Sequence, residues 1–188
     1  EEAGALQNLA WTAYESGHAE VAESHLEASV AVFTAIGDTG GLGWAQGLLA
    51  WVKFHRGDFA DAEALAERLL PETGHRGDMW AVGMLRMLIA SVRLWSGRAD
   101  EALAPAEEAA AAMVRADDLG GQVQAASTVA RVLVVMGGIA EGVAAMERGK
   151  ELGAEVQSFQ TNHEGDMVER IHQGYFDGVD AVLINAGA

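Results

Sequence analysis

The chain has 188 residues, half of them hydrophobic, and its 12 basic and 28 acidic residues give a formal net charge of −16. Such a charge repels phosphates and anionic lipid surfaces, so we expect neither a nucleic-acid nor a membrane partner. No apolar run approaches the roughly 20 residues that a membrane span needs. The absence of cysteine excludes disulfides and thiolate chemistry and is compatible with the cytoplasmic location that we predict.

A glycine that recurs every 40 residues indicates an internal repeat. An alanine precedes each of these glycines by seven positions, and a small residue follows each by five. Four copies of one short unit predict stacked supersecondary elements rather than one enzyme core. The glycines are Gly17, Gly57, Gly97 and Gly137, the alanines are Ala10, Ala50, Ala90 and Ala130, and the small residues are Ala22, Ala62, Ala102 and Gly142.

Each unit is predicted to contain two helices joined at the glycine. Bulky apolar residues recur at helical spacing before each glycine, in the stretches 6–16, 42–56, 80–96 and 123–136. Glycine permits a tight turn, after which acidic residues open the second helix near its positive N-terminal end. Asp38, Asp78 and Asp118 stand where the next unit begins, so we predict that they cap its first helix.

These units resemble the tetratricopeptide repeat family over about residues 3–152. The family's usual unit has about 34 residues, so longer helices or connections are expected here. The resemblance implies a mainly α fold, a right-handed α-solenoid of four two-helix repeats that forms a domain over residues 1–152. Such long repeats are similar to those of large bacterial regulatory and signalling proteins. The resemblance rests on Ala10, Gly17 and Ala22 and on the aromatic positions Trp11, Tyr14, Trp51 and Phe54.

The resemblance also implies a concave groove lined by the first helix of each unit. The family's groove positions give an aromatic and methionine-rich lining in which Arg131 is the only basic residue. We therefore predict an apolar or amphipathic protein or peptide partner rather than an acidic tail. The alternative is that these rings pack between repeats as core. The positions are Gln7, Trp11, Tyr14, Trp44, Trp51, Phe54, Met84, Met87, Trp95, Gln124 and Arg131.

No cofactor, metal site or catalytic residue is predicted within the repeats. The histidines fall on different helices or turns without metal-motif spacing. His163 and Glu164 begin like a zinc-protease motif, but Met167 stands where the second histidine is required. The glycine pairs at 40–41 and 120–121 lack the lysine and serine of a nucleotide-binding loop.

The repeat stops near residue 152, and residues 153–188 follow a different pattern. An alternating stretch at 156–159, an amphipathic stretch at 166–173 and an apolar run at 181–184 predict a small βαβ-like segment. The second strand is apolar on both faces, as in a buried parallel sheet. Residues just beyond the carboxyl end of such a strand commonly meet a ligand.

This segment resembles part of the type II 3-dehydroquinate dehydratases, through residues 159–165, 170–172 and 183–188 and reaching back to 148–152. The resemblance implies a partial flavodoxin-like fragment in which Asn185 and the backbone of Gly187 contact substrate. The family converts 3-dehydroquinate to 3-dehydroshikimate with a tyrosine, a nearby arginine and a histidine. None of these three groups has a counterpart here, so the chain is expected to be inactive as it stands.

Two functions remain open. The favoured one is a noncatalytic interaction scaffold of helical repeats, part of a larger regulatory protein. The alternative is a fragment or fusion of a type II 3-dehydroquinate dehydratase. The chain is expected to be a piece of a longer protein, and the exposed edges of its two C-terminal strands offer a route to self-association.

Overall fold

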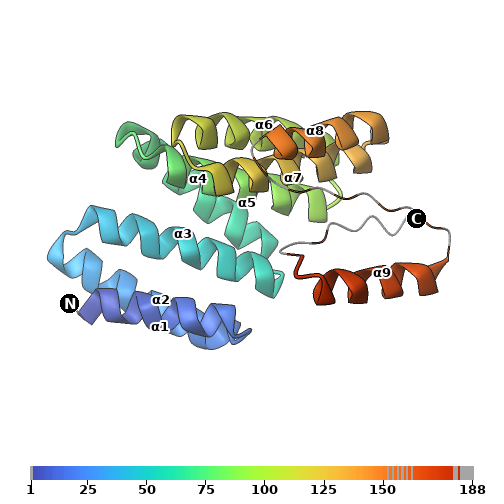
Figure 1. Ribbon diagram of the computed structural model, residues 1–188. Helices are drawn as coiled ribbons and strands as arrows, with labels where there is room; N and C mark the ends of the chain where they lie inside the picture. The colour runs from blue at the N-terminus through green and yellow to red at the C-terminus, as the bar shows by residue number, and fades with distance from the viewer. Residues whose placement is uncertain are drawn as a thin grey trace.

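The computed structural model describes residues 2–151, 163–179 and the single positions 153, 155, 157, 159, 161 and 182, without the side chains of 148–151. These described residues form nine helices and no strand (Figure 1), which confirms the expected mainly helical fold. In chain order the helices are α1 (Glu2–Glu15), α2 (Ala19–Ile36), α3 (Thr39–Arg56), α4 (Phe59–His75), α5 (Met79–Trp95), α6 (Ala99–Arg115), α7 (Leu119–Val135), α8 (Ile139–Glu151) and α9 (Glu164–Phe176).

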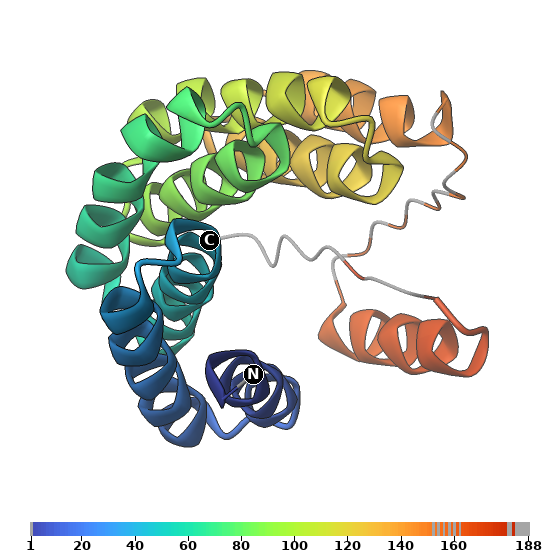
Figure 2. The same ribbon diagram turned by 90° about the vertical axis from the view of Figure 1, so that its left-hand side faces the viewer.

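Helices α1 to α8 form four helix pairs stacked one after another. Each helix packs on the next along the chain, and the first helices of neighbouring pairs, α1, α3, α5 and α7, also contact one another. The second helices make no such contacts among the described residues. The stack therefore curves, with the first helices on its inner side and the second helices on its outer side (Figure 2).

The turns require residues in the left-handed backbone conformation. The four repeated glycines end the first helices with φ between 75° and 90°, a region that glycine enters without steric cost. Gly37 and Gly77 do the same between units, each with φ of 71°. In the third connection between units the corresponding residue is Asp117, with φ of 54°. It is the only non-glycine residue with positive φ in the described chain.

Two of the three predicted N-caps are confirmed. A carboxylate oxygen of Asp38 accepts from the backbone N–H of Gly41 at 3.0 Å, and one of Asp78 accepts from Ala81 at 3.0 Å. Asp118 precedes α7 in the same place, but its side chain accepts no capping hydrogen bond, so that part of the prediction is wrong. Its backbone follows the left-handed Asp117, where the two earlier caps follow a glycine.

The repeated small residues are buried between packed helices. The seven repeated alanines are 0% exposed. A Cβ atom at Gly142 would lie 2.5 Å from Cγ2 of Val134 and 3.1 Å from the carbonyl oxygen of Ala130, so glycine alone fits without displacement. The repeat pattern is thus set by contact between the two helices of each unit.

The predicted βαβ arrangement of the C-terminal segment is not seen. Helix α9 contains the predicted amphipathic stretch, but the described positions 157, 159 and 182 are not in strands. The other positions of both predicted strands lie outside the described residues. A strand needs a hydrogen-bonding neighbour, and the described residues do not supply the strand that lies between these two in the flavodoxin-like order. Helix α9 contacts none of α1 to α8 within the described chain.

Candidate functional site

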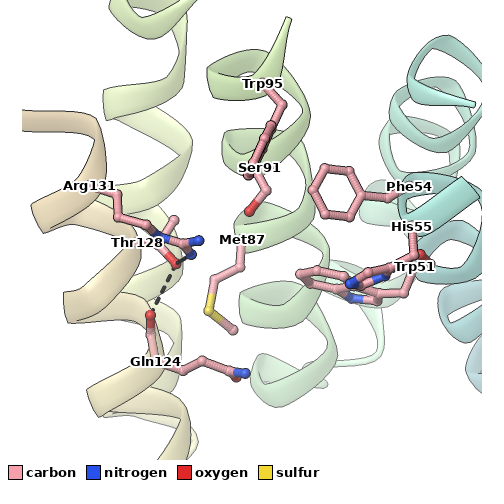
Figure 3. Close-up of a pocket in the computed structure, with 9 residues that line it drawn as sticks. All are labelled: Trp51, Phe54, His55, Met87, Ser91, Trp95, Gln124, Thr128 and Arg131. Carbon is pink, nitrogen blue, oxygen red and sulfur yellow. Dashed lines mark hydrogen bonds between the residues drawn. The ribbon is translucent and has the colours of Figure 1, made fainter. Parts of the chain in front are cut away.

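The inner side of the stack carries two adjoining cavities that share Trp51, His55 and Gln124. The smaller cavity has a volume of about 290 Å³ and lies between α3, α5 and α7 (Figure 3). The larger cavity has a volume of about 500 Å³ and lies mainly between α1, α3 and α5. Together they form a continuous groove, because the three shared residues belong to both walls.

All the sequence-predicted groove residues except Gln7 line these cavities. The side-chain amide of Gln7 instead donates to the carbonyl of Gly41 at 3.0 Å and joins α1 to α3. Binding by the other residues stays a prediction. The smaller cavity is lined by Trp51, Phe54, Met87, Trp95, Gln124 and Arg131, and the larger by Trp11, Tyr14, Trp44, Trp51, Met84 and Gln124.

The groove contains aromatic side chains that the protein core does not cover. Trp95 is 66% exposed and Trp11 is 47% exposed, whereas Met87 is only 1% exposed. The alternative, in which these side chains pack between repeats as core, therefore fits Met87 but not Trp11 or Trp95. Exposed apolar side chains gathered in one concavity are typical of surfaces that bind a partner or ligand.

His55 joins the two cavities through a hydrogen-bonded aromatic cluster. Its Nδ1 lies 3.0 Å from the Tyr14 hydroxyl oxygen and 2.9 Å from the carbonyl oxygen of Trp51. The rings of Phe54 and His55 meet edge to face with centroids 5.1 Å apart. Burial, with a smaller effect of Glu15, raises the pKa of Tyr14, so its hydroxyl keeps its proton. Depending on the tautomer, Nδ1 of His55 either accepts from this hydroxyl or donates to the carbonyl of Trp51, because one ring nitrogen cannot do both.

Arg131 lies on α7 at the wall of the smaller cavity without a carboxylate partner among the described residues. One terminal nitrogen donates to the hydroxyl of Thr128 at 3.3 Å, and its Nε is buried without a hydrogen-bond partner. Burial lowers the pKa of the guanidinium. The indole N–H of Trp51, in the same cavity, is also buried and unpaired. Two residues that line the smaller cavity therefore each carry a buried donor without a partner among the described residues, although most buried polar groups in proteins are paired.

Unlike Arg131, the basic side chains between neighbouring helix pairs form ion pairs with glutamates. The side chain of Arg93 in α5 donates to Glu63 at 2.6 Å and to Glu67 at 2.9 Å, and Lys53 in α3 donates to Glu23 at 2.8 Å. Burial acts to raise the pKa of Glu63, but the hydrogen bonds from Arg98 and Arg93 outweigh it and lower that pKa. These ion pairs join neighbouring units, whereas Arg131 has no carboxylate partner among the described residues.

Several lining residues were not predicted from the sequence. Ser91 and Thr128 follow Met87 and Gln124 by one helical turn, so the helical spacing contained that signal. Arg76 lies just after α4, outside the first helices, and donates to the carbonyl of Thr39 at 2.9 Å. Because Arg76 lines the larger cavity, the expectation that Arg131 is the groove's only basic residue is wrong.

The C-terminal segment presents no comparable site in its described part. Asn185 and Gly187, the substrate contacts implied by resemblance, lie outside the described residues. At the start of α9 the hydroxyl of Thr161 donates to Asp166 at 2.9 Å, which orders the helix end locally. No group of His, Asp or Glu side chains in the described residues is arranged to hold a metal ion. No helix of the described chain is long and apolar enough to cross a membrane.

Comparison with known proteins separates the two parts of the chain. Residues 139–188 match the family model of class II dehydroquinase. A 3-dehydroquinate dehydratase from Leptothrix cholodnii is 75% identical over 32 residues, 17% of this chain and 22% of that protein. One from Pelobacter propionicus is 73% identical over 30 residues, 16% of this chain and 20% of that protein. The chain spans about a fifth of the length of these relatives.

A solved structure is similar to nearly the whole chain in fold. The crystal structure of BtubC (BKLC) from P. vanneervenii superposes with a TM-score of 0.68 at 15% identity, covering 98% of this chain and 71% of that one. At that identity the likeness concerns the fold alone, and the tetratricopeptide resemblance stays a prediction. The family match begins at Ile139, the first residue of α8. The chain thus joins a helical array to a C-terminal segment similar to class II dehydroquinases, and the match begins within the array's last helix.

Proposed function

We propose that this chain is a noncatalytic interaction scaffold whose groove binds an apolar or amphipathic segment of a protein partner. The observation that carries the proposal is the gathering of exposed aromatic side chains, Trp11, Trp44 and Trp95, along two adjoining cavities. A helix laid in such a groove presents apolar residues at helical spacing.

The energetics favour recognition by a few anchor side chains. Covering about 100 Å² of apolar surface contributes about 2.5 kcal/mol. Several anchors are needed because association also costs translational and conformational entropy. Tryptophans suit this role, since they offer a large contact area with few rotatable bonds. The Met84 and Met87 side chains beside them can adapt to differently shaped partners.

The test is a selection of short random peptides on the purified 188-residue chain, followed by affinity measurements on two matched variants. Trp44→Glu places a charge in the larger cavity, whereas Val114→Glu places the same charge at an exposed position of α6 outside both cavities. We expect enriched peptides to carry apolar residues at helical spacing. Trp44→Glu should bind them at least about tenfold more weakly, which corresponds to about 1.4 kcal/mol.

Circular dichroism and the unfolding midpoint check that both variants fold. Peptides that bind the parent chain and Val114→Glu alike, but not Trp44→Glu, support the groove. Failure to enrich any peptide above a selection without protein, or equal binding to both variants, counts against the scaffold proposal.

A second candidate function, 3-dehydroquinate dehydratase, is favoured by the match of residues 139–188. We infer that the 188-residue chain does not turn over, because its resemblance supplies Asn185 and Gly187 but no matching acid or base. The purified chain should form no conjugated 3-dehydroshikimate from 3-dehydroquinate by ultraviolet absorbance. Product formation that Asn185→Ala abolishes, while Tyr175→Phe leaves it unchanged, would establish the enzyme instead.

A further inference from the structure

Two residues that line the smaller cavity carry hydrogen-bond donors without an acceptor among the described residues. The buried Nε of Arg131 and the buried indole N–H of Trp51 have no partner in the described chain. A guanidinium carries five N–H donors, and among the described residues Arg131 donates only to the hydroxyl of Thr128, at 3.3 Å. Figure 3 shows the Arg131 side chain beside Thr128, on the wall opposite Trp51.

This lack of a partner is not caused by a shortage of acids. The sequence has 28 acidic residues for 12 basic ones, and Arg86, Arg93 and Arg98 each pair with at least one glutamate. No acidic residue lines the smaller cavity. A half-buried charge without a counterion costs stability, so its retention at a cavity wall needs a compensating role.

The other lining residues define what kind of acceptor fits. The rings of Trp51, Phe54 and Trp95 and the side chain of Met87 offer apolar contact. The volume of about 290 Å³ suits one bulky side chain or a small organic molecule. A neutral carbonyl would satisfy the hydrogen bonds of Arg131 but not its charge, whereas a carboxylate satisfies both and can pair with two N–H groups at once.

We propose that the smaller cavity binds a carboxylate carried on an aromatic or aliphatic body, with Arg131 pairing the carboxylate and the rings of Trp51, Phe54 and Trp95 contacting the body. This inference rests on the proposed groove function and specifies the chemistry of its ligand. It adds one carboxylate to the apolar or amphipathic segment that the groove is expected to bind.

The net charge of −16 opposes the approach of an anion but does not prevent the pairing. Repulsion between separated surface charges is screened over about 8 Å at physiological ionic strength. A contact between Arg131 and a carboxylate inside a half-buried cavity is screened much less. The excess of acidic residues therefore favours ligands with a single carboxylate over those with several.

The test compares 3-phenylpropionate with 3-phenylpropionamide, which has nearly the same shape without the charge. Binding to the 188-residue chain is followed by tryptophan fluorescence and by ligand-observed NMR. We expect the acid to bind about tenfold more tightly than the amide, and Arg131→Gln to reduce this preference to about twofold or less. Arg131→Lys should retain part of it. Arg115→Gln, the same change at an exposed position outside both cavities, should retain all of it.

A peptide arm distinguishes the two sources of a carboxylate. Acetyl-Ala-Leu-Phe is tested with a free C-terminal carboxylate and as its C-terminal amide. If the free-acid peptide binds more tightly than phenylpropionate and loses its advantage in Arg131→Gln, a peptide carboxylate is the ligand. If the small acid alone binds and depends on Arg131, the carboxylate inference stands and the peptide-groove function fails.

Two results would overturn the carboxylate inference itself. Equal binding of acid and amide in every variant would do so while leaving the groove function intact, because both peptides would still bind. Absence of binding by all four probes at millimolar concentration would also do so, with the peptide selection on Trp44→Glu deciding the groove function separately. Unfolding midpoints of each variant exclude loss of binding through misfolding.

Discussion

The hydroxyl oxygen of Tyr14 in α1 lies 3.0 Å from Nδ1 of His55 in α3 and connects the first two units across the groove. Tyr14→Phe removes this hydrogen bond and keeps the ring, so we expect the free energy of unfolding to fall by about 1 kcal/mol. Urea unfolding followed by circular dichroism measures the change. Tyr175→Phe is the matched control, because Tyr175 is 81% exposed and should be neutral. Equal effects of the two variants would contradict a structural role for this contact.

Asp117 breaks the glycine pattern at a turn that Gly37 and Gly77 make with the same left-handed backbone. A non-glycine residue costs free energy in this conformation, although aspartate tolerates it better than most. We therefore expect Asp117→Gly to raise the free energy of unfolding by about 0.5 to 1 kcal/mol. This is the net effect, because glycine relieves the backbone strain but also increases the entropy of the unfolded chain. Gly77→Ala should lower it by about 1 kcal/mol. Destabilisation by Asp117→Gly would show that the carboxylate contributes more than the backbone strain costs.

Local requirements were readable from the sequence. A left-handed turn needs a particular residue type at a particular place, and the spacing of Gly17 and its counterparts located the turns between the helices of each unit. Close helix packing needs a small side chain, and Ala22 and its counterparts located these contacts. The groove followed because residues on the first helices face inward together. Gln7 shows the limit of this reasoning, since a partner on the neighbouring helix took up its amide.

Structural properties that depend on many interatomic distances at once could not be predicted from the sequence. Arg131 was expected in the groove, but its lack of a counterion depends on where every carboxylate of the described chain lies. Arg76 reaches the larger cavity from the connection after α4, which the groove pattern does not include. The predicted C-terminal strands are not seen at the described positions 157, 159 and 182, because strand pairing is non-local and an apolar run alone does not supply the neighbouring strand.

Glu63 in α4 accepts hydrogen bonds from Arg93 at 2.6 Å and from Arg98 at 2.5 Å and so joins the second and third units. Its pKa is lowered from the ordinary 4.5 in the folded protein. Its contribution to stability is therefore complete above pH 4.5 and is lost as the pH falls below 4.5 through the lowered pKa.

We expect Glu63→Gln to lower the free energy of unfolding by about 1 kcal/mol at neutral pH and by progressively less in acid. Urea unfolding of both proteins from neutral pH to about pH 3 measures this convergence. Glu108→Gln, which breaks the more exposed pair with Arg86, should cost less than about 0.5 kcal/mol. A difference for Glu63→Gln that stays constant with pH would mean that packing, not charge, explains its effect.

Arg131 and Arg93 should respond in opposite ways to the same substitution. Arg131→Met removes a half-buried charge that has no carboxylate partner in the described chain and retains an apolar side chain of similar length. The free energy of unfolding should therefore rise by about 1 kcal/mol. Arg93→Met leaves Glu63 with one cation fewer and should lower it by about 1 kcal/mol or more. Urea unfolding midpoints at neutral pH compare the two.

A gain in stability that coincides with loss of the preference for 3-phenylpropionate over its amide would mean that Arg131 is retained for binding at a cost in stability. If Arg131→Met destabilises as Arg93→Met does, its aliphatic stem and hydrogen bond to Thr128 hold the array together, and the charge needs no ligand to explain it.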